Sequence, residues 1–162
     1  MEFIYTDVDV NQIMRELEGI FRLRLEEADV PVRIIFEPKL PVCFIHTEKN
    51  RISQVISNFL SNAFKYTPEE GEIQVSLATG HDMARKDALR EYFEIAITDS
   101  GIGIDRNKIE RIFERFYQID NDVTKSNFGT GIGLHLSRSL VQLHHGEILA
   151  ENREDAPGSR FI

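Results

Sequence analysis

The sequence predicts an α+β fold, built as a two-layer sandwich of helices on a sheet. Strand-like runs are mostly neighbours along the chain, and the helical runs stand in blocks between them. A regular alternation of strands and helices would instead predict a doubly wound parallel sheet. The 162 residues fit one domain of ordinary size, large enough to close a single core. We therefore expect residues 1–162 to form a single domain.

Apolar residues at helical spacing predict three long helices. The first covers about 9–27, the second about 47–66 and the third about 132–144. Thr47 is the expected cap of the second helix. A shorter helix is expected at 108–113.

Short runs with β-branched and aromatic residues predict the strands. They lie at 32–36, 42–45, 72–77, 92–98, 147–150 and 160–162. The charged stretch 81–90 is the expected exposed connection of a hairpin. The stretch 118–128 is polar and irregular.

Composition and charge limit the classes of function. The formal net charge is −8, whereas a broad nucleic-acid surface needs a basic face, so we expect no nucleic-acid partner. No apolar run approaches the roughly 20 residues that span a bilayer, and we see no basic–apolar leader, so we expect no membrane contact by this domain itself. The single cysteine, Cys43, excludes an internal disulfide, suits a reducing compartment and is expected to be a buried strand residue.

The second predicted helix carries an unusual polar side. Gln54, Asn58, Asn62 and Lys65 fall within an arc of roughly 80° opposite the apolar residues. Solvated helix sides usually carry Glu, Lys and Arg, whereas Asn inside a helix costs about half a kcal/mol relative to Ala. Amide oxygens suit Mg²⁺, and a lysine suits the phosphates that the ion bridges. From this helix alone, a metal–phosphate site and a solvated face both remain open.

The predicted strand 92–98 runs directly into the segment Asp99-Ser100-Gly101-Ile102-Gly103-Ile104. Asp and Gly are common in turns, so a plain turn is one explanation. In the functional alternative, the Asp99 carboxylate accepts a hydrogen bond from the exocyclic amine of adenine. Gly101 and Gly103 would then let the backbone approach a flat base.

A second glycine stretch, residues 129–134, opens directly into the third predicted helix. The amides and dipole of a helix start form an anion site. The spacing is G-x-G-x-G, which is not the dinucleotide-binding fingerprint, and the chain has neither a P-loop nor the signatures of eukaryotic-type protein kinases. Between the glycine stretches lie Phe113, Phe116 and a polar loop with Lys125 near its tip. A glycine-hinged loop beside a phosphate site is how lids are built.

In this order and at this spacing, these four segments resemble the N box, first glycine box, F box and second glycine box of sensor histidine kinases. The resemblance covers nearly all of residues 48–162, and residues 1–47 fit the family's preceding strand, helix and hairpin less specifically. It implies the fold shared with type II topoisomerases, mismatch-repair ATPases and related chaperones. That fold is a mixed, mostly antiparallel sheet of about five strands backed by three helices, with ATP between the helices and a lid.

The resemblance also implies roles for individual residues. Asn58 matches the family's Mg²⁺ ligand, Asn62 lines the metal and phosphate region, and Lys65 and Tyr66 match residues beside the phosphates and ribose. The remaining nucleotide contacts are expected from Asp99, Gly101, Gly103 and Ile104 around the base, and from Gly129, Thr130, Gly131, Gly133 and Leu134 at the lid hinge and phosphate cradle. The position that often holds an arginine after the aromatic residues is Gln118 here, so contacts with the γ-phosphate are expected to shift to Arg115 or Lys125.

The expected activity is in-line transfer of the γ-phosphoryl group of MgATP to a histidine on a partner dimerisation domain, within a two-component kinase that signals to a response regulator. Neutral imidazole is already a nucleophile near pH 7, so the task is positioning and charge neutralisation by Asn58, Lys65 and the helix amides after Gly129. The family's acceptor-histidine hairpin is absent from this chain, so the fragment alone is not expected to phosphorylate itself. The last strand is expected to stop early at Ile162, and the parent protein to be membrane-anchored with this domain in the cytoplasm.

Two other functions remain open. ATP hydrolases of the related chaperone and topoisomerase type place a glutamate one turn before the metal-binding Asn, but that position is Gln54 here, whose amide cannot take a proton at neutral pH. Gln54 is therefore expected to orient a reacting group, although Glu48 nearby keeps hydrolysis open. The other alternative is a catalytically inactive module that binds nucleotide, or nothing, and signals through its surface.

Overall fold

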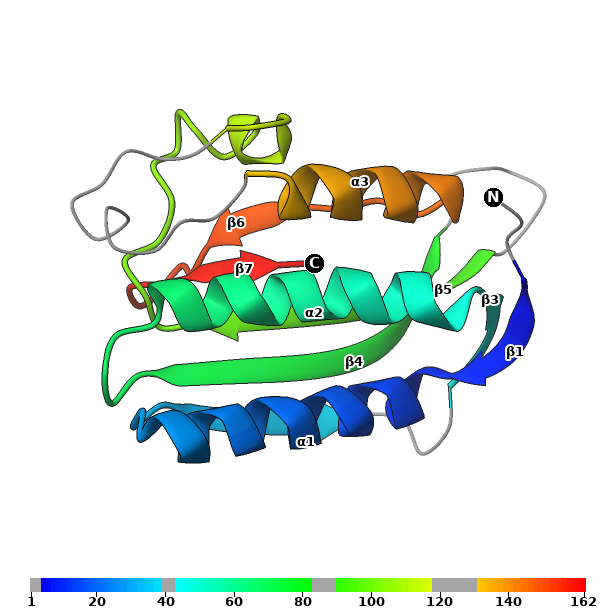
Figure 1. Ribbon diagram of the computed structural model, residues 1–162. Coiled ribbons are helices and arrows are strands. Elements are labelled where there is room, and N and C mark those ends of the chain that lie inside the picture. The colour runs from blue at the N-terminus through cyan, green and yellow to red at the C-terminus, as the bar shows by residue number, and fades with distance from the viewer. Residues whose placement is uncertain (1–3, 39–42, 83–89, 118–130) are drawn as a thin grey trace.

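The computed structural model describes residues 4–38, 43–82, 90–117 and 131–162. In this part of the chain, three α-helices lie side by side in one layer over a sheet (Figure 1). The predicted two-layer α+β sandwich is confirmed.

The helices agree with their predicted ranges to within two residues at each end. They are α1 (Val10–Ala28), α2 (Lys49–Tyr66) and α3 (Gly133–Leu143). The short helix expected at 108–113 is only a 3-10 turn, η1 (Arg111–Phe113), which packs against α3. Glu110, the residue before this turn, makes no side-chain capping hydrogen bond, so no cap stabilises a longer helix at its start.

The main sheet has five strands in the order β2-β4-β5-β7-β6. They are β2 (Arg33–Pro38), β4 (Glu72–Asp82), β5 (Arg90–Asp99), β6 (Ala150–Asn152) and β7 (Ser159–Phe161). Only the pairing of β2 with β4 is parallel, and the other three pairings are antiparallel. The sheet is therefore mixed and mostly antiparallel, as predicted.

The hairpin expected before α2, from the strand runs 32–36 and 42–45, is not formed. The strands β1 (Thr6–Asp9) and β3 (Phe44–Thr47) pair with each other in a separate two-stranded sheet, whereas β2 joins the main sheet. Each strand finds a better partner at long range: Val8 pairs with Ile45 between β1 and β3, and Ile34 pairs with the fully buried Ile73 between β2 and β4. Burial of apolar faces, and not closeness in sequence, therefore decides which strands pair.

Several strand boundaries also differ from the expected ones. β4 and β5 continue into the stretch predicted as an exposed connection, pairing as far as Asp82 with Arg90. Gly80 lies opposite Tyr92, and a Cβ at Gly80 would come within 2.4 Å of the Tyr92 ring, so the ring covers the glycine in the paired strands. β6 begins at Ala150 instead of 147, because its register is set by pairing with β7.

The cap of α2 is Glu48, one residue later than predicted. Its carboxylate accepts a hydrogen bond from the Arg51 amide at 3.0 Å. Thr47 is instead the buried last residue of β3, where it pairs with Thr6. Strand pairing therefore extends one residue further than the helix-start signal suggested.

The core lies between the helix layer and the inner face of the sheet. The buried side of α2 consists of Ile52, Val55, Ile56, Phe59, Leu60 and Ala63. Phe59 packs against Phe161 of β7 with ring centres 5.5 Å apart, and Phe64 stacks on Phe21 of α1 at 5.0 Å. Because this side of α2 is committed to the core, its amide side is left facing α3.

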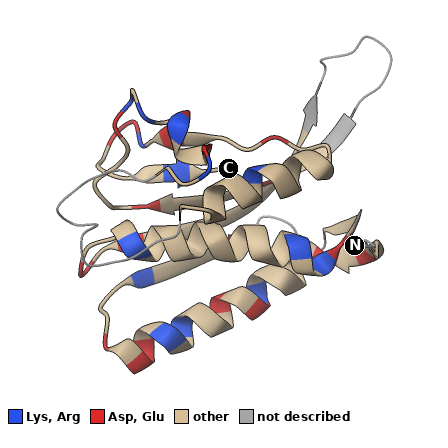
Figure 2. Ribbon diagram, turned by 45° about the horizontal axis from the view of Figure 1, so that its top comes forward, with Lys and Arg blue, Asp and Glu red and all other residues tan. Residues whose placement is uncertain are grey.

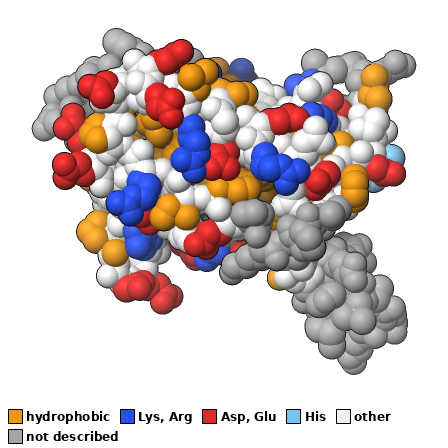
Figure 3. All heavy atoms as spheres, turned by 90° about the horizontal axis from the view of Figure 1, so that it is seen from below, with side chains coloured by type: hydrophobic (Ala, Val, Ile, Leu, Met, Phe, Trp, Pro, Cys, Tyr) orange, Lys and Arg blue, Asp and Glu red, His pale blue; other side chains and the backbone are white. Residues whose placement is uncertain are grey.

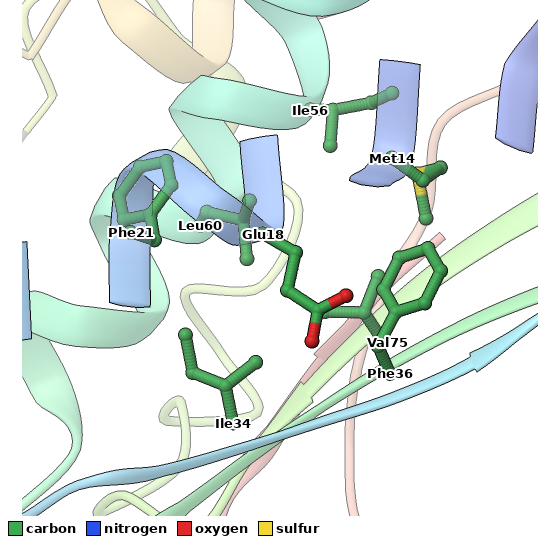
Figure 4. A pocket seen from close by; sticks show the side chains of 8 residues that line it. All are labelled: Met14, Glu18, Phe21, Ile34, Phe36, Ile56, Leu60 and Val75. Atoms are coloured by element: carbon green, nitrogen blue, oxygen red, sulfur yellow. The ribbon is translucent and has the colours of Figure 1, made fainter. Parts of the chain in front are cut away.

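A small cavity of about 10 Å³ lies between α1, α2 and the sheet (Figure 4). Its lining residues are Met14, Glu18, Phe21, Ile34, Phe36, Ile56, Leu60 and Val75. Glu18 is one of these lining residues and pairs with Arg22, whose guanidinium also donates to the main-chain oxygen of Ile34 at 3.2 Å. A space of this size holds about one water molecule, so it is a packing feature and not a nucleotide site.

The side of the molecule below α1 in Figure 1 mixes acidic and basic side chains with scattered apolar ones (Figure 3). The ion pairs of α1 include Arg22–Glu18 within the helix and the link from Glu16 to Lys49 of α2 at 3.1 Å. Exposed pairs of this kind contribute only a few tenths of a kcal/mol each. We therefore regard α1 as a structural element of the sandwich.

Cys43 is buried, as predicted, although it precedes β3 instead of lying within it. Burial raises the pKa of the Cys43 thiol, and the nearby Asp9 carboxylate raises it further. Because the folded state favours the neutral thiol, this contribution to stability is present below the ordinary cysteine pKa and is lost as the pH rises through the raised pKa.

We expect iodoacetamide at pH 8 to modify Cys43 at least about tenfold more slowly in the native protein than in urea. Equal rates, measured by mass spectrometry, would contradict this placement of Cys43.

Candidate functional site

Asn58 lies at the centre of the contact between α2 and α3. Its Nδ2 donates to the main-chain oxygen of Gly133 and to Oγ of Ser137, both at 3.1 Å. Because a main-chain carbonyl can only accept, the Gly133 contact fixes which way the amide points. In the described part of the chain both of these hydrogen bonds are made by Nδ2, and they leave Asn58 Oδ1 available as a hard oxygen ligand. The structure thus brings the amide side of α2 to the glycine-led start of α3.

The other residues of the amide side extend in both directions from Asn58. Gln54 Oε1 accepts a hydrogen bond from Arg51 at 3.4 Å, and Asn62, one turn later, is half-buried. Lys65 is also half-buried, and its ammonium lies 5.2 Å from the centre of the Tyr66 ring. The middle of α2 carries no charge, and basic residues stand near its two ends (Figure 2).

Asp99 is a buried carboxylate, only 2% exposed, at the end of β5. Its Oδ1 accepts from the amides of Gly101 at 2.8 Å and Ser159 at 3.3 Å, and its Oδ2 accepts from the Ser159 hydroxyl at 2.5 Å. These three donors hold the carboxylate in one orientation. A carboxylate offers about four acceptor positions, so Oδ2 can still accept from one further donor.

The Asp99 turn lies directly against the end of α2. A Cβ at Gly101 would come within 2.4 Å of the main-chain oxygen of Tyr66, so no side chain fits there. Gly103 has a φ of +76°, a conformation that favours glycine. The lack of a side chain at Gly101 therefore lets the turn pack on the end of α2, which brings Asp99 close to Tyr66.

The start of α3 is joined to the aromatic segment after η1. The Phe116 amide donates to the main-chain oxygen of Gly131 at 3.0 Å, and both residues have positive φ, +64° and +66°. Phe116 is 63% exposed, and the Arg115 guanidinium lies 4.8 Å from its ring centre. Phe116, the residue after Arg115, is thus placed beside Gly131, and Leu134 is half-buried in the first turn of α3.

The remaining predicted contacts, Lys125, Gly129 and Thr130, lie outside the described residues, as does Gln118. The predicted lid falls in the same range. Their expected roles stay predictions.

Three residues that anchor this region were not singled out from the sequence. Ser137 is fully buried and meets Asn58 from the inner side of α3. Ser159 holds Asp99, and Asn152 of β6 binds the main chain of Ile104. A polar residue four positions after Gly133 could have signalled Ser137, but Asn152 carries no local signal.

In the described part of the chain, no three His, Cys, Asp or Glu side chains gather to hold a metal ion. A divalent ion here would instead depend on amide oxygens and on the ligand's own phosphates. Asn58 Oδ1 has the hard donor character that Mg²⁺ prefers, and Mg²⁺ commonly binds few protein groups while keeping waters and phosphates. The donor set of this site therefore fits Mg²⁺ carried by a nucleotide.

The fold and the convergence of α2, the Asp99 turn and the α3 start are those of an ATP-binding domain. The chain belongs to the histidine kinase-, DNA gyrase B- and HSP90-like ATPase family, whose model matches residues 47–162.

Among curated proteins, the chain is similar to sensor kinases. It is 36% identical over 156 residues to the autoinducer 2 sensor kinase/phosphatase LuxQ of Vibrio vulnificus (strain YJ016), which covers 96% of the chain. It is 35% identical over 111 residues, or 68% of the chain, to the sensor histidine kinase WalK of Bacillus subtilis (strain 168). The chain spans 17% of the length of each of these two relatives.

Among solved structures, the catalytic domain of the histidine kinase ThkA, in a nucleotide-free form, aligns with a TM-score of 0.77 and 26% identity. The alignment covers 99% of this chain and 93% of that one. ThkA in complex with the response regulator protein TrrA aligns with a TM-score of 0.73 and 25% identity, over 97% of this chain and 40% of that one. The resemblance to histidine kinase catalytic domains is therefore confirmed. Within the described residues, no helix has the length and apolar character needed to cross a membrane.

Proposed function

We propose that this domain binds MgATP and transfers its γ-phosphoryl group to a histidine on a partner dimerisation domain, within a two-component sensor kinase. The contact of Asn58 with Gly133 and Ser137 carries the proposal, because it joins a potential metal ligand to a potential phosphate cradle. The relatives named as sensor kinases support the signalling context. The neighbour solved with its response regulator supports a cognate response regulator as a downstream partner.

In the proposed binding mode, Asp99 Oδ2 accepts from the exocyclic amine of adenine. The buried position of Asp99 supports this role, because a hydrogen bond shielded from water is more selective than an exposed one. Lys65 and Tyr66 lie toward the phosphates and ribose. The backbone contacts come from Gly101, Gly103 and Ile104 along the base, and from Gly129, Thr130, Gly131, Gly133 and Leu134 at the cradle.

The chemistry proposed for the chain's own residues is positioning. Mg²⁺, held through Asn58 and Asn62, would neutralise charge on the phosphates. Lys65 adds a positive charge at the end of α2, and Arg115 or Lys125 takes the place of the arginine missing at position 118. Gln54 orients the reacting group by a hydrogen bond. No base is needed to activate a neutral imidazole.

Transfer is favoured over hydrolysis by the residues around Gln54. An amide cannot accept a proton from water at neutral pH. The nearby carboxylate, Glu48, caps α2 through the Arg51 amide and lies 3.6 Å from the Arg51 guanidinium. Both contacts hold Glu48 at the helix start, which makes it a poor candidate for a mobile base.

The surroundings of three of the chain's five histidines support an acceptor located elsewhere. Nδ1 of His144 lies 2.8 Å from the Leu140 oxygen, and its Nε2 is buried. Nδ1 of His135 lies 3.2 Å from the Phe113 oxygen. Nδ1 of His46 lies 3.0 Å from the Asp7 carboxylate. Each of these three rings therefore has a structural contact.

The test is transfer from γ-labelled ATP. We expect the chain alone to acquire no stable label, and an added histidine-containing dimerisation domain of the parent kinase to become labelled with an acid-labile, base-stable phosphate when Mg²⁺ is present. Release of inorganic phosphate without labelled protein would support the hydrolase alternative. Label on the chain alone would show that one of its own histidines is an acceptor.

The inactive-module alternative is tested by calorimetry. We expect both MgATP and MgADP to bind saturably at one site. If neither binds, the interaction-module function is favoured.

We further propose that the parent protein is membrane-anchored with this domain on its cytoplasmic side, and that the domain itself contacts neither membrane nor nucleic acid. The net charge of −8 supports the absence of a nucleic-acid partner.

A further inference from the structure

We infer that Asn152 is a positioning residue that holds the loop 101–104 beside the adenine site. This inference rests on the proposed binding of ATP. Asn152 Oδ1 accepts from the Ile104 amide at 2.7 Å, and Nδ2 donates to the Ile104 oxygen at 2.6 Å. One side chain thus binds both main-chain groups of Ile104, as a neighbouring strand would. The contact joins residues 48 positions apart and fixes the loop on which Gly101 and Gly103 lie.

Gly103 lies close to the side chain of Asn152. A Cβ at Gly103 would come within 2.9 Å of Asn152 Oδ1, and the positive φ of Gly103 disfavours other residues in any case. The glycine next to Ile104 is therefore required for the Asn152 amide to reach the main chain.

The turn that follows Asn152 contacts Asp99, at the other edge of the same site. The Arg153 amide donates to the Gly158 oxygen at 3.1 Å, and Gly158 lies so close to the main-chain oxygen of Asp99 that no Cβ fits. The next residue, Ser159, holds the Asp99 carboxylate. The β6–β7 hairpin therefore sets both Asp99 and Ile104, and with them the separation between the base-reading carboxylate and the loop beside it.

None of these contacts reaches Asn58 or the start of α3. Loosening Asn152 should therefore impair recognition of the base while leaving the groups that position the phosphates in place. This separation distinguishes a positioning role in the adenine site from a general contribution to folding.

The test uses Asn152→Ala and the isosteric Asn152→Asp, which keeps the acceptor for the Ile104 amide but loses the donor to its oxygen. For Asn152→Ala we expect the affinity for MgADP to fall about tenfold, since two hydrogen bonds are lost. In transfer to the dimerisation domain, the KM for ATP should rise by a similar factor while kcat stays within about twofold. Hydrogen exchange at the Ile104 amide should become faster. Asn152→Asp places a carboxylate oxygen against the Ile104 oxygen, where two acceptors repel, so it should show the same pattern at least as strongly.

Glu151→Ala is the matched control, because Glu151 is on the same strand, is exposed and pairs with Arg160. It should change neither the affinity nor the KM. Wild-type affinity in a folded Asn152→Ala variant would overturn the inference, as would a fall in kcat at unchanged KM. If Asn152→Ala does not fold, wild-type affinity in Asn152→Asp would overturn it equally. A wild-type chain that binds no ADP would instead contradict the proposed function itself.

Discussion

Replacing Asp99 with alanine is expected to weaken nucleotide binding by about 1–3 kcal/mol, or roughly 5- to 150-fold, because the exocyclic amine of adenine loses its acceptor. The same change also removes the acceptor of the Gly101 amide and of the amide and hydroxyl of Ser159. Since Asp99 is buried, these donors would be left without a partner in the interior, and stability should fall as well.

Asp99→Asn separates these two effects. Its amide oxygen can still accept from Gly101 and Ser159, and the Ser159 hydroxyl can rotate to accept from the new amide group. A donor then faces the donor of adenine, so we expect the affinity for MgADP to fall nearly as far as in Asp99→Ala, with a smaller drop in the unfolding midpoint. Calorimetry and thermal unfolding measure the two quantities. An Asp99→Asn variant with unchanged affinity would remove Asp99 from the adenine role.

Asn58→Ala is expected to reduce Mg²⁺-dependent transfer by more than roughly 100-fold, which corresponds to about 3 kcal/mol of lost transition-state stabilisation. Binding of ADP without Mg²⁺ should change much less, because the base contacts are made at Asp99. The measurement is the single-turnover rate of transfer from ATP to the dimerisation domain, at saturating nucleotide. A wild-type rate would refute the proposed metal role.

Ser137→Ala is the control for Asn58. It removes one of the two hydrogen bonds from Asn58 to α3 and leaves the amide oxygen in place. We expect a modest effect, well below that of Asn58→Ala. If both variants lost transfer equally, Asn58 would act by packing α2 against α3, and another group would hold the ion.

Residue types that are unusual for their setting allowed much of the candidate site to be predicted from the sequence. Asn58 and Asn62 within a helix contradict what packing alone would favour, whereas Asp99 before two glycines is common in turns and received its expected role from the resemblance to histidine kinases. The helix ranges followed equally well from apolar periodicity. These signals are local, so they are visible without the fold.

The features that sequence reasoning missed depend on contacts between distant segments. Ser137 meets Asn58 across 79 positions, and Asn152 meets Ile104 across 48. Neither residue has a neighbour in sequence that indicates its partner. The pairing of β3 with β1 was missed for the same reason, since adjacent runs such as β2 and β3 suggest a hairpin until burial of both faces is considered.

We propose that one Mg²⁺-bound adenine nucleotide lies between α2, the Asp99 turn and the start of α3. A crystal structure of the chain with Mg²⁺ and a non-hydrolysable ATP analogue tests it most directly. We expect the exocyclic amine within hydrogen-bond distance of Asp99 Oδ2, and the metal on Asn58 Oδ1 with the phosphates beside Gly133. An analogue bound elsewhere, or a metal ligated without Asn58, would contradict it.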